Sequence, residues 1–252
     1  MRLGFIGAGS MAFALARGFG EPAVVFSPNR EHARALATEI SGTVAESIAQ
    51  LARDADLVIL AHKPAVLEQV AAETDDQVRA VASMVAAVPT TRLEELYPDR
   101  PVYRFMPNIP VEVGRGVLCY APGELAAEGP EEEVLALFGR CGVVIGLDEP
   151  LLEPAMALMS CGPAFLALVV ESLASAGARH GLDPRLATRL VVETMAGTAT
   201  HLDANDLDAA GLRRRVATPG GLTEKGLGVL EERGLAGTLA AAVDLVVAEA
   251  VK

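Results

Sequence analysis

The stretch L-G-F-I-G-A-G-S-M-A, residues 3–12, joins a short apolar run to two glycines and the start of a helical pattern. The apolar run predicts a buried strand, and the residues after the glycines predict a helix. The spacing G-x-G-x-x-A between strand and helix is the fingerprint of a dinucleotide-binding α/β domain. In this interpretation Gly7 allows a tight turn, Gly9 allows the pyrophosphate to approach, and Ala12 allows close packing of helix on strand.

The helix that follows the turn is expected to help bind the phosphates. Its first backbone N–H groups have no acceptor inside the helix, and its dipole places partial positive charge at that end. Cofactor contacts are therefore predicted for the whole turn, Gly7, Ala8, Gly9, Ser10 and Met11.

Up to residue 148 the chain alternates apolar runs with helical patterns. This alternation predicts a mostly parallel sheet covered by helices on both faces, that is, an α/β Rossmann-like domain. Strands are expected at 3–7, 23–27, 56–61, 79–87, 102–106, 117–121 and 143–147, and helices at 10–19, 30–40 and 64–73.

Residues 149–252 show a different pattern, because every segment there reads as a helix. We expect an all-α domain with helices at 151–159, 164–180, 184–201, 207–217, 224–233 and 235–251. Several of these are apolar nearly all round, such as F-L-A-L-V-V-E-S-L-A-S-A-G at 165–177, and must be buried. About 100 residues cannot bury them all, so the pattern predicts a homodimer formed by this domain.

Composition limits the classes of function. The formal net charge of −12 argues against a general nucleic-acid binder, which needs a basic face. Three scattered cysteines and four scattered histidines fit neither a disulfide framework nor a metal site. No signal peptide or apolar run of membrane-spanning length is evident, so a cytoplasmic protein without membrane contact is expected.

The end of the second expected strand bears on the choice of cofactor. Enzymes that use NAD usually carry an acid there for the ribose 2′-hydroxyl, whereas this chain has F-S-P-N-R at 26–30. The side chains of Ser27, Asn29 and Arg30 suit a 2′-phosphate, so NADPH is favoured, with NADH as the alternative. In the simpler interpretation, Arg30 only begins the next helix on a solvated face.

Five motifs in order resemble the pyrroline-5-carboxylate reductase family: G-F-I-G-A-G-S-M-A (4–12), A-H-K-P (61–64), R-F-M-P-N-I-P (104–110), G-P-A-F (162–165) and A-T-P-G-G-L-T-E-K-G-L-G-V-L-E (217–231). The resemblance runs nearly end to end. It implies a Rossmann-like domain followed by a helical domain that interleaves two subunits, with rings of dimers in some members. The implied reaction is the NADPH-dependent reduction of 1-pyrroline-5-carboxylate to L-proline, in proline biosynthesis.

By this resemblance, the glycine pair near the C-terminus binds the substrate. Bare backbone N–H groups ahead of a helix bind carboxylates well, and the resemblance places the substrate carboxylate at Thr218, Gly220, Gly221 and Leu222. The Thr223 hydroxyl would hydrogen-bond the ring nitrogen and help to deliver its proton. A glycine C-cap followed by a threonine N-cap is the structural alternative.

The resemblance assigns further roles outside this loop. Glu149 matches an acid near substrate and cofactor that favours an iminium electrostatically. In the structural alternative, Glu149 is only an acid in the first turn of the next helix. Ala61, Lys63 and Pro64 match a segment along the cofactor, and Asn108 matches one near the nicotinamide. Without the resemblance, Lys63 reads as a surface loop residue and Asn108 as a turn residue.

Some positions depart from the family pattern. Met159, Cys161 and Leu222 replace small polar residues, and Ala87 stands where a glycine is usual. These changes leave two other functions open: a reductase of a related cyclic imine, and an NADP-binding dimer whose active site has decayed.

Overall fold

The computed structural model describes residues 1–74 and 76–250. It contains a first compact unit, Met1–Ser160, and a second that begins at Cys161.

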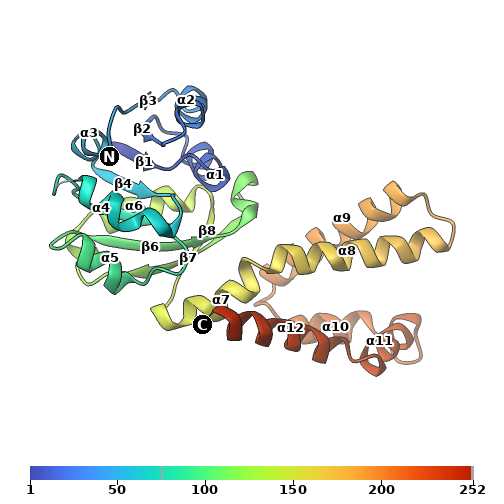
Figure 1. Ribbon diagram of the computed structural model, residues 1–252. Helices are drawn as coiled ribbons and strands as arrows, with labels where there is room; N and C mark the ends of the chain where they lie inside the picture. The colour runs from blue at the N-terminus through green and yellow to red at the C-terminus, as the bar shows by residue number, and fades with distance from the viewer. Residues whose placement is uncertain (75, 251–252) are drawn as a thin grey trace. The chain divides into compact units, whose positions relative to one another are not determined.

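The first unit is built on one eight-stranded sheet in the order β3-β2-β1-β4-β5-β6-β7-β8 (Figure 1). Its strands are β1 (Leu3–Ile6), β2 (Ala23–Phe26), β3 (Thr43–Val44), β4 (Leu57–Leu60), β5 (Val81–Ser83), β6 (Val102–Pro107), β7 (Gly116–Pro122) and β8 (Gly142–Gly146). All neighbouring strands are parallel except β6 and β7. The order from β3 to β6 is that of the Rossmann fold, as the sequence predicts.

Helices cover both faces of this sheet (Figure 1). They are α1 (Ser10–Phe19), α2 (Arg30–Glu39), α3 (Ile48–Asp54), α4 (Leu67–Thr74), α5 (Thr90–Leu96), α6 (Glu131–Gly139) and α7 (Leu152–Met159). Short 3₁₀ turns lie at Pro64–Val66 (η1), Ile109–Val113 (η2), Ala126–Glu128 (η3) and Glu149–Leu151 (η4).

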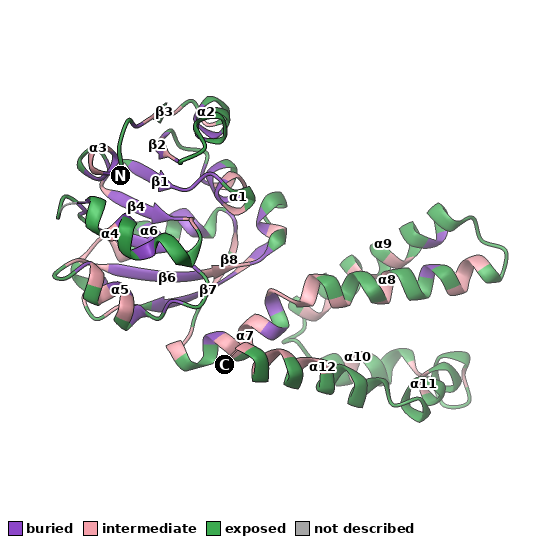
Figure 2. Cartoon of the chain, viewed as in Figure 1, coloured by how far each residue is buried: buried purple, intermediate pink, exposed green. Residues whose placement is uncertain are grey.

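The sheet separates two apolar cores, because alternate residues of a strand point to opposite faces. In β4, Leu57 and Ile59 belong to one core and Val58 and Leu60 to the other. All four are fully buried, which explains why the strand is a continuous apolar run. Figure 2 shows the buried residues concentrated along the sheet.

Up to residue 250, the second unit consists of five helices: α8 (Gly162–Arg179), α9 (Pro184–Asp203), α10 (Ala209–Val216), α11 (Leu222–Glu232) and α12 (Leu235–Ala250). Helices α8 and α9 lie side by side (Figure 1). Asp183 caps α9 by accepting the Leu186 N–H at 2.9 Å, and Pro184 follows in the first turn, as expected from the sequence.

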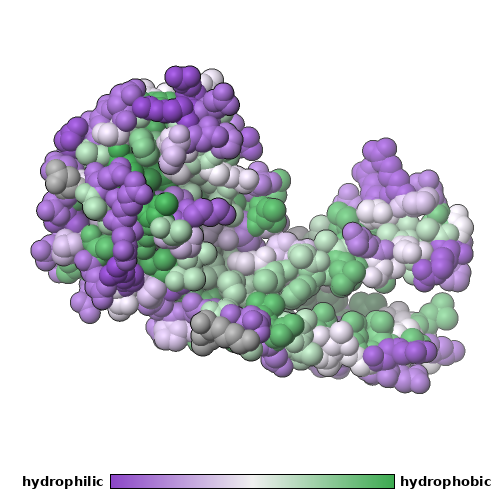
Figure 3. All heavy atoms as spheres, in the orientation of Figure 1, coloured by the Kyte–Doolittle hydropathy of each residue, from purple (hydrophilic) through white to green (hydrophobic). Residues whose placement is uncertain are grey.

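Little of the second unit is buried in one chain. Among its described residues only Ala174 and Ala187 are buried, while Leu168 is 62% exposed and Leu245 is 63% exposed. Figure 3 shows apolar atoms on the visible surface of these helices. An apolar surface of this kind is typical of an interface with another protein chain.

The stretch Glu149–Arg179 is long and apolar enough to cross a membrane by length and composition, with a mean hydropathy of 1.7 in its most apolar window. The sequence analysis did not identify a stretch of this length. A break between α7 and α8 divides it, and helices that pack against protein partners meet the same criteria.

Most of the expected elements are present, and the predicted bounds of the first helix, 10–19, are those of α1. The sequence-based prediction lacks β3, α3, α5 and α6. The first three are seven residues or shorter, so their apolar pattern spans too little chain to detect.

Candidate active site

A cavity of about 910 Å³ opens at the carboxyl ends of β1, β2 and β4. Strand β1 lies between β2 and β4, so the chain turns to opposite sides of β1 at this point. Such a switch point is where open α/β sheets bind their ligands. The cavity walls include the β1–α1 turn, the end of β2, and the segment from Ala61 to Val66.

The turn after β1 has the geometry that the glycine fingerprint predicts. Gly7 has φ +110°, and a side chain there would collide with the carbonyl oxygen of Ala61. Gly9 is the N-cap of α1, makes no side-chain cap, and has no protein atom within 4 Å of where a Cβ would lie. The first N–H groups of α1 are therefore available to an anion, and the residues fit the diphosphate of a dinucleotide.

Most of the predicted cofactor residues line this one cavity: Gly7, Ala8, Gly9, Ser10, Met11, Ser27, Ala61, Lys63 and Pro64. The cavity walls also include residues that the sequence analysis missed, among them His32, Gln69 and Glu73. His32 lies in the first turn of α2, next to the carboxyl end of β2. This place in the sequence was the signal that could have identified it as a residue of the cofactor site.

Asn29 and Arg30 do not line the cavity. The Asn29 side chain caps α2 by accepting the N–H groups of Glu31 and His32 at 3.0 and 3.3 Å. The Arg30 guanidinium donates to the Ala45 carbonyl at 3.1 Å and to the Glu46 carboxylate at 2.8 Å. A phosphate would therefore compete with Glu46 for Arg30, and the phosphate-binding role stays a prediction.

Asn108 is buried and links two parts of the first unit. Its amide donates to the Met159 carbonyl at 2.8 Å, and its side-chain oxygen accepts the Val117 N–H at 2.9 Å. These bonds fix the end of β6 to β7 and to the end of α7. The nicotinamide contact expected for Asn108 stays a prediction.

His62 is a titratable group that the sequence analysis left out. Because a carbonyl can only accept, Nδ1 carries the proton that bonds the Lys63 carbonyl at 2.9 Å. Nε2 is buried without a hydrogen-bond partner. Burial lowers the pKa of His62, so its imidazole is neutral at pH 7 in the cavity wall.

Glu149 lies in a partly buried polar cluster. Its carboxylate accepts the backbone N–H and the hydroxyl of Thr90, both at 2.6 Å, and the Arg104 guanidinium at 2.7 Å. Burial raises the pKa of Glu149, but the bonds from Thr90 and Arg104 outweigh this effect and hold the pKa below its usual value. Glu149 is therefore an ionised carboxylate with a neutralising partner.

Arg104 was missed by the sequence analysis, although a charged residue in an apolar strand signals a buried partner. Its side chain is 6% exposed and also lies 3.5 Å from Glu153 on α7. Arg104 on β6 and Asn108 just after it thus hold the start and the end of α7. The primary roles visible for Glu149 and Asn108 are to fix α7 to the sheet.

The predicted substrate residues lie together in the second unit, ahead of α11. Gly220 has φ +75°, and Gly221 is the N-cap of α11 with no side-chain cap. Thr223 is in the first turn, and Leu222 is 87% exposed. The expectation that this loop lies against the cofactor site of the first unit stays a prediction.

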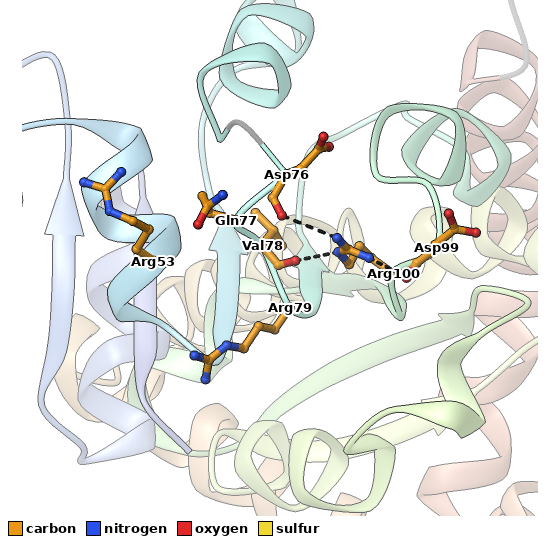
Figure 4. A pocket seen from close by; sticks show the side chains of 7 residues that line it. All are labelled: Arg53, Asp76, Gln77, Val78, Arg79, Asp99 and Arg100. Carbon is orange, nitrogen blue, oxygen red and sulfur yellow. Dashed lines mark hydrogen bonds between the residues drawn. The ribbon is translucent and has the colours of Figure 1, made fainter.

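A second cavity, of about 560 Å³, lies at the opposite ends of the strands, near the amino ends of β4, β5 and β6. Its walls include Arg53, Arg79 and Arg100 (Figure 4). Arg100 donates to the Val78 carbonyl at 2.7 Å, and Arg79 pairs with Asp56. The three guanidinium groups point in different directions in Figure 4, so they do not form a single anion site.

No group of three or more His, Cys, Asp or Glu residues is arranged to hold a metal ion in residues 1–74 and 76–250. The three cysteines are free thiols, two of them buried. The fold and the glycine-rich turn define the chain as a Rossmann-type dinucleotide-binding protein.

Two stretches of the chain match known protein families. Residues 149–252 match the family described as pyrroline-5-carboxylate reductase dimerisation, and residues 2–87 match NADP oxidoreductase coenzyme F420-dependent. The chain is 32% identical over 244 residues to the pyrroline-5-carboxylate reductase of Aquifex aeolicus, with 95% of this chain and 92% of the relative covered.

Two solved structures have the same fold over nearly the whole chain. The pyrroline-5-carboxylate reductase of Coxiella burnetii matches with a TM-score of 0.90 and 26% identity, covering 98% of this chain and 96% of that one. The pyrroline carboxylate reductase of Plasmodium falciparum, solved with NADP bound, matches at 0.84 and 26%, covering 99% and 97%. This chain belongs to the pyrroline-5-carboxylate reductase family.

Proposed function

We propose that the protein is a homodimeric reductase that uses NADPH to convert 1-pyrroline-5-carboxylate to L-proline. The observation that carries the proposal is the cavity at the switch point of the sheet, whose uncapped α1 N-terminus fits a dinucleotide diphosphate. Family membership over nearly the whole chain supports the choice of substrate.

The first unit binds the cofactor. Residues 7–11 hold the diphosphate with backbone N–H groups, and Ala61, Lys63 and Pro64 line its path. Ser27, Asn29 and Arg30 bind the ribose 2′-phosphate after the Arg30 guanidinium releases the Glu46 carboxylate. Bound NADPH supplies the hydride, which reaches the imine carbon while the ring nitrogen gains a proton.

The loop ahead of α11 binds the substrate. Thr218, Gly220, Gly221 and Leu222 surround the carboxylate, and the Thr223 hydroxyl hydrogen-bonds the ring nitrogen. Glu149 acts from the first unit. Its cluster holds two carboxylates and one guanidinium, Glu149, Glu153 and Arg104, so the excess negative charge favours an iminium.

The assembly follows from the exposed helices. The predicted NADP-binding domain is residues 1–148 and the predicted dimerisation and substrate domain is 149–252, although residues 149–160 belong to the first compact unit. The exposed apolar faces of the helices from Cys161 onward are buried against a second copy. A ring of dimers is the larger assembly that the family resemblance suggests. A cytoplasmic location without membrane or nucleic-acid contact fits the acidic charge.

A reductase of a related cyclic imine is the second candidate. The observation that favours it is Leu222, an apolar side chain 87% exposed in the loop proposed for the carboxylate. A decayed NADP-binding dimer is the third, and Met159 and Cys161 in place of small polar residues favour it.

Purified protein, NADPH and 1-pyrroline-5-carboxylate test the proposal directly, with loss of nicotinamide absorbance and appearance of proline as readouts. Thr223→Ala is expected to lower turnover about 10²-fold while NADPH binding is unchanged, because the proton donor is lost. Thr223→Ser, which keeps the hydroxyl, is the matched control and is expected to retain most turnover. Binding of NADPH without reduction of this imine by wild type would refute the function.

A further inference from the structure

The donors of the loop ahead of α11 are partly occupied by the chain itself. The Gly220 N–H donates to Glu224 Oε2 at 2.7 Å, and the Gly221 N–H donates to the Thr218 carbonyl at 2.9 Å. The N–H groups of Leu222 and Thr223 are in the first turn, where a helix offers no acceptor. The Glu224 carboxylate of the protein itself therefore already accepts one of the N–H groups of this loop.

The loop backbone fixes this arrangement. Gly220 adopts φ +75°, which L side chains rarely allow, and a Cβ at Gly221 would lie 2.6 Å from the Thr218 hydroxyl. The tight turn brings the Gly220 N–H back over the first turn of α11, within reach of Glu224.

Glu224 is not neutralised by a cation. In residues 1–74 and 76–250, no Lys, Arg or His nitrogen lies within ion-pair distance of its carboxylate. Glu231 on the same helix, in contrast, lies 3.5 Å from Arg213. The negative charge of Glu224 therefore repels an anionic ligand that binds the loop.

We infer that Glu224 sets the charge preference of the substrate loop, by disfavouring a cyclic imine that carries a carboxylate relative to the same ring without one. This inference rests on the proposed function, which brings the substrate carboxylate to this loop. The substrate class of the wild-type protein accordingly extends to carboxylate-free imines such as 1-pyrroline.

The size of the effect follows from Coulomb's law. Two like charges about 5 Å apart in a water-like medium repel enough to change a binding constant about fourfold, and more where water is excluded. Glu224→Gln removes the charge but keeps an oxygen that can accept the Gly220 N–H. We expect it to raise kcat/KM for 1-pyrroline-5-carboxylate about fivefold and to leave kcat/KM for 1-pyrroline unchanged.

Glu232→Gln is the matched control, because it removes the same charge from an exposed position two turns further along α11. It is expected to leave the ratio of the two kcat/KM values unchanged. A parallel loss for both imines in Glu224→Gln would show that Glu224 only caps the loop, and would overturn the inference. An unchanged ratio would overturn it as well.

A binding measurement separates this inference from the proposed function. Calorimetry with NADP⁺-loaded protein compares L-proline with pyrrolidine, the same ring without a carboxylate. Tighter L-proline binding in Glu224→Gln, with no turnover of either imine by wild type, would refute the function and keep the inference. Turnover by wild type with an unchanged ratio would keep the function and overturn the inference, and failure of both readouts would overturn both.

Discussion

Removing the Glu149 carboxylate is the sharpest test of the partly buried cluster. Glu149→Ala leaves Arg104, whose side chain is 6% exposed, without its partner at 2.7 Å, and leaves the Thr90 N–H without an acceptor. Breaking a buried ion pair costs about 3–5 kcal/mol. Because Glu153 remains 3.5 Å from Arg104, we expect the lower part of this range, a loss of about 3 kcal/mol in unfolding free energy.

Glu149→Gln keeps one acceptor oxygen in a side chain of the same size and is expected to cost about 1–2 kcal/mol, because the charge and one of the two acceptor oxygens are lost. Urea denaturation at one fixed protein concentration measures both variants. The double variant Arg104→Met with Glu149→Ala is expected to be more stable than Glu149→Ala alone, since the deeply buried guanidinium is removed and only the partly exposed Glu153 carboxylate loses a partner. A loss below about 1 kcal/mol in Glu149→Ala, or a double variant no better than the single one, would refute the reasoning.

Three further outcomes are expected. Ala87 has φ +56°, so Ala87→Gly should raise the unfolding free energy by about 1 kcal/mol in urea denaturation, and no gain would contradict the strain. Hydrogen bonds from Arg2 hold the pKa of Asp56 below its usual value, so the ionised carboxylate stabilises the fold above about pH 4 and this contribution is lost as pH falls. Asp56→Asn should therefore make the unfolding free energy fall less steeply at acid pH. Arg30→Ala should weaken NADPH more than NADH in fluorescence titrations, and Glu46→Gln, which frees Arg30, should tighten NADPH alone; equal changes for both cofactors would exclude a phosphate role.

The cofactor half of the site was predictable because its chemistry depends on backbone. Gly7 is needed for the turn because of its φ of +110°, and Gly9 leaves the N-terminus of α1 without a side chain. This local pattern is visible in residues 3–12. The helices of the second unit were equally visible, since their apolar patterns are long.

The polar contacts between distant residues were not predictable. Glu149 bonds Thr90 at the start of α5 and Arg104 on β6, which are 59 and 45 residues away in the sequence and come together only in the folded unit. Arg30 was expected to be free for a phosphate, but Glu46 from the segment before α3 lies against it. Such pairings depend on tertiary packing, and one sequence read alone carries little signal for them.

Transfer of deuterium from labelled cofactor tests the central claim most directly. Protein incubated with 1-pyrroline-5-carboxylate and NADPH deuterated at the transferred position of C4 should form proline that is heavier by one mass unit, with the label on the former imine carbon. Unlabelled proline, or oxidation of the cofactor without any proline, would contradict direct hydride transfer to this imine.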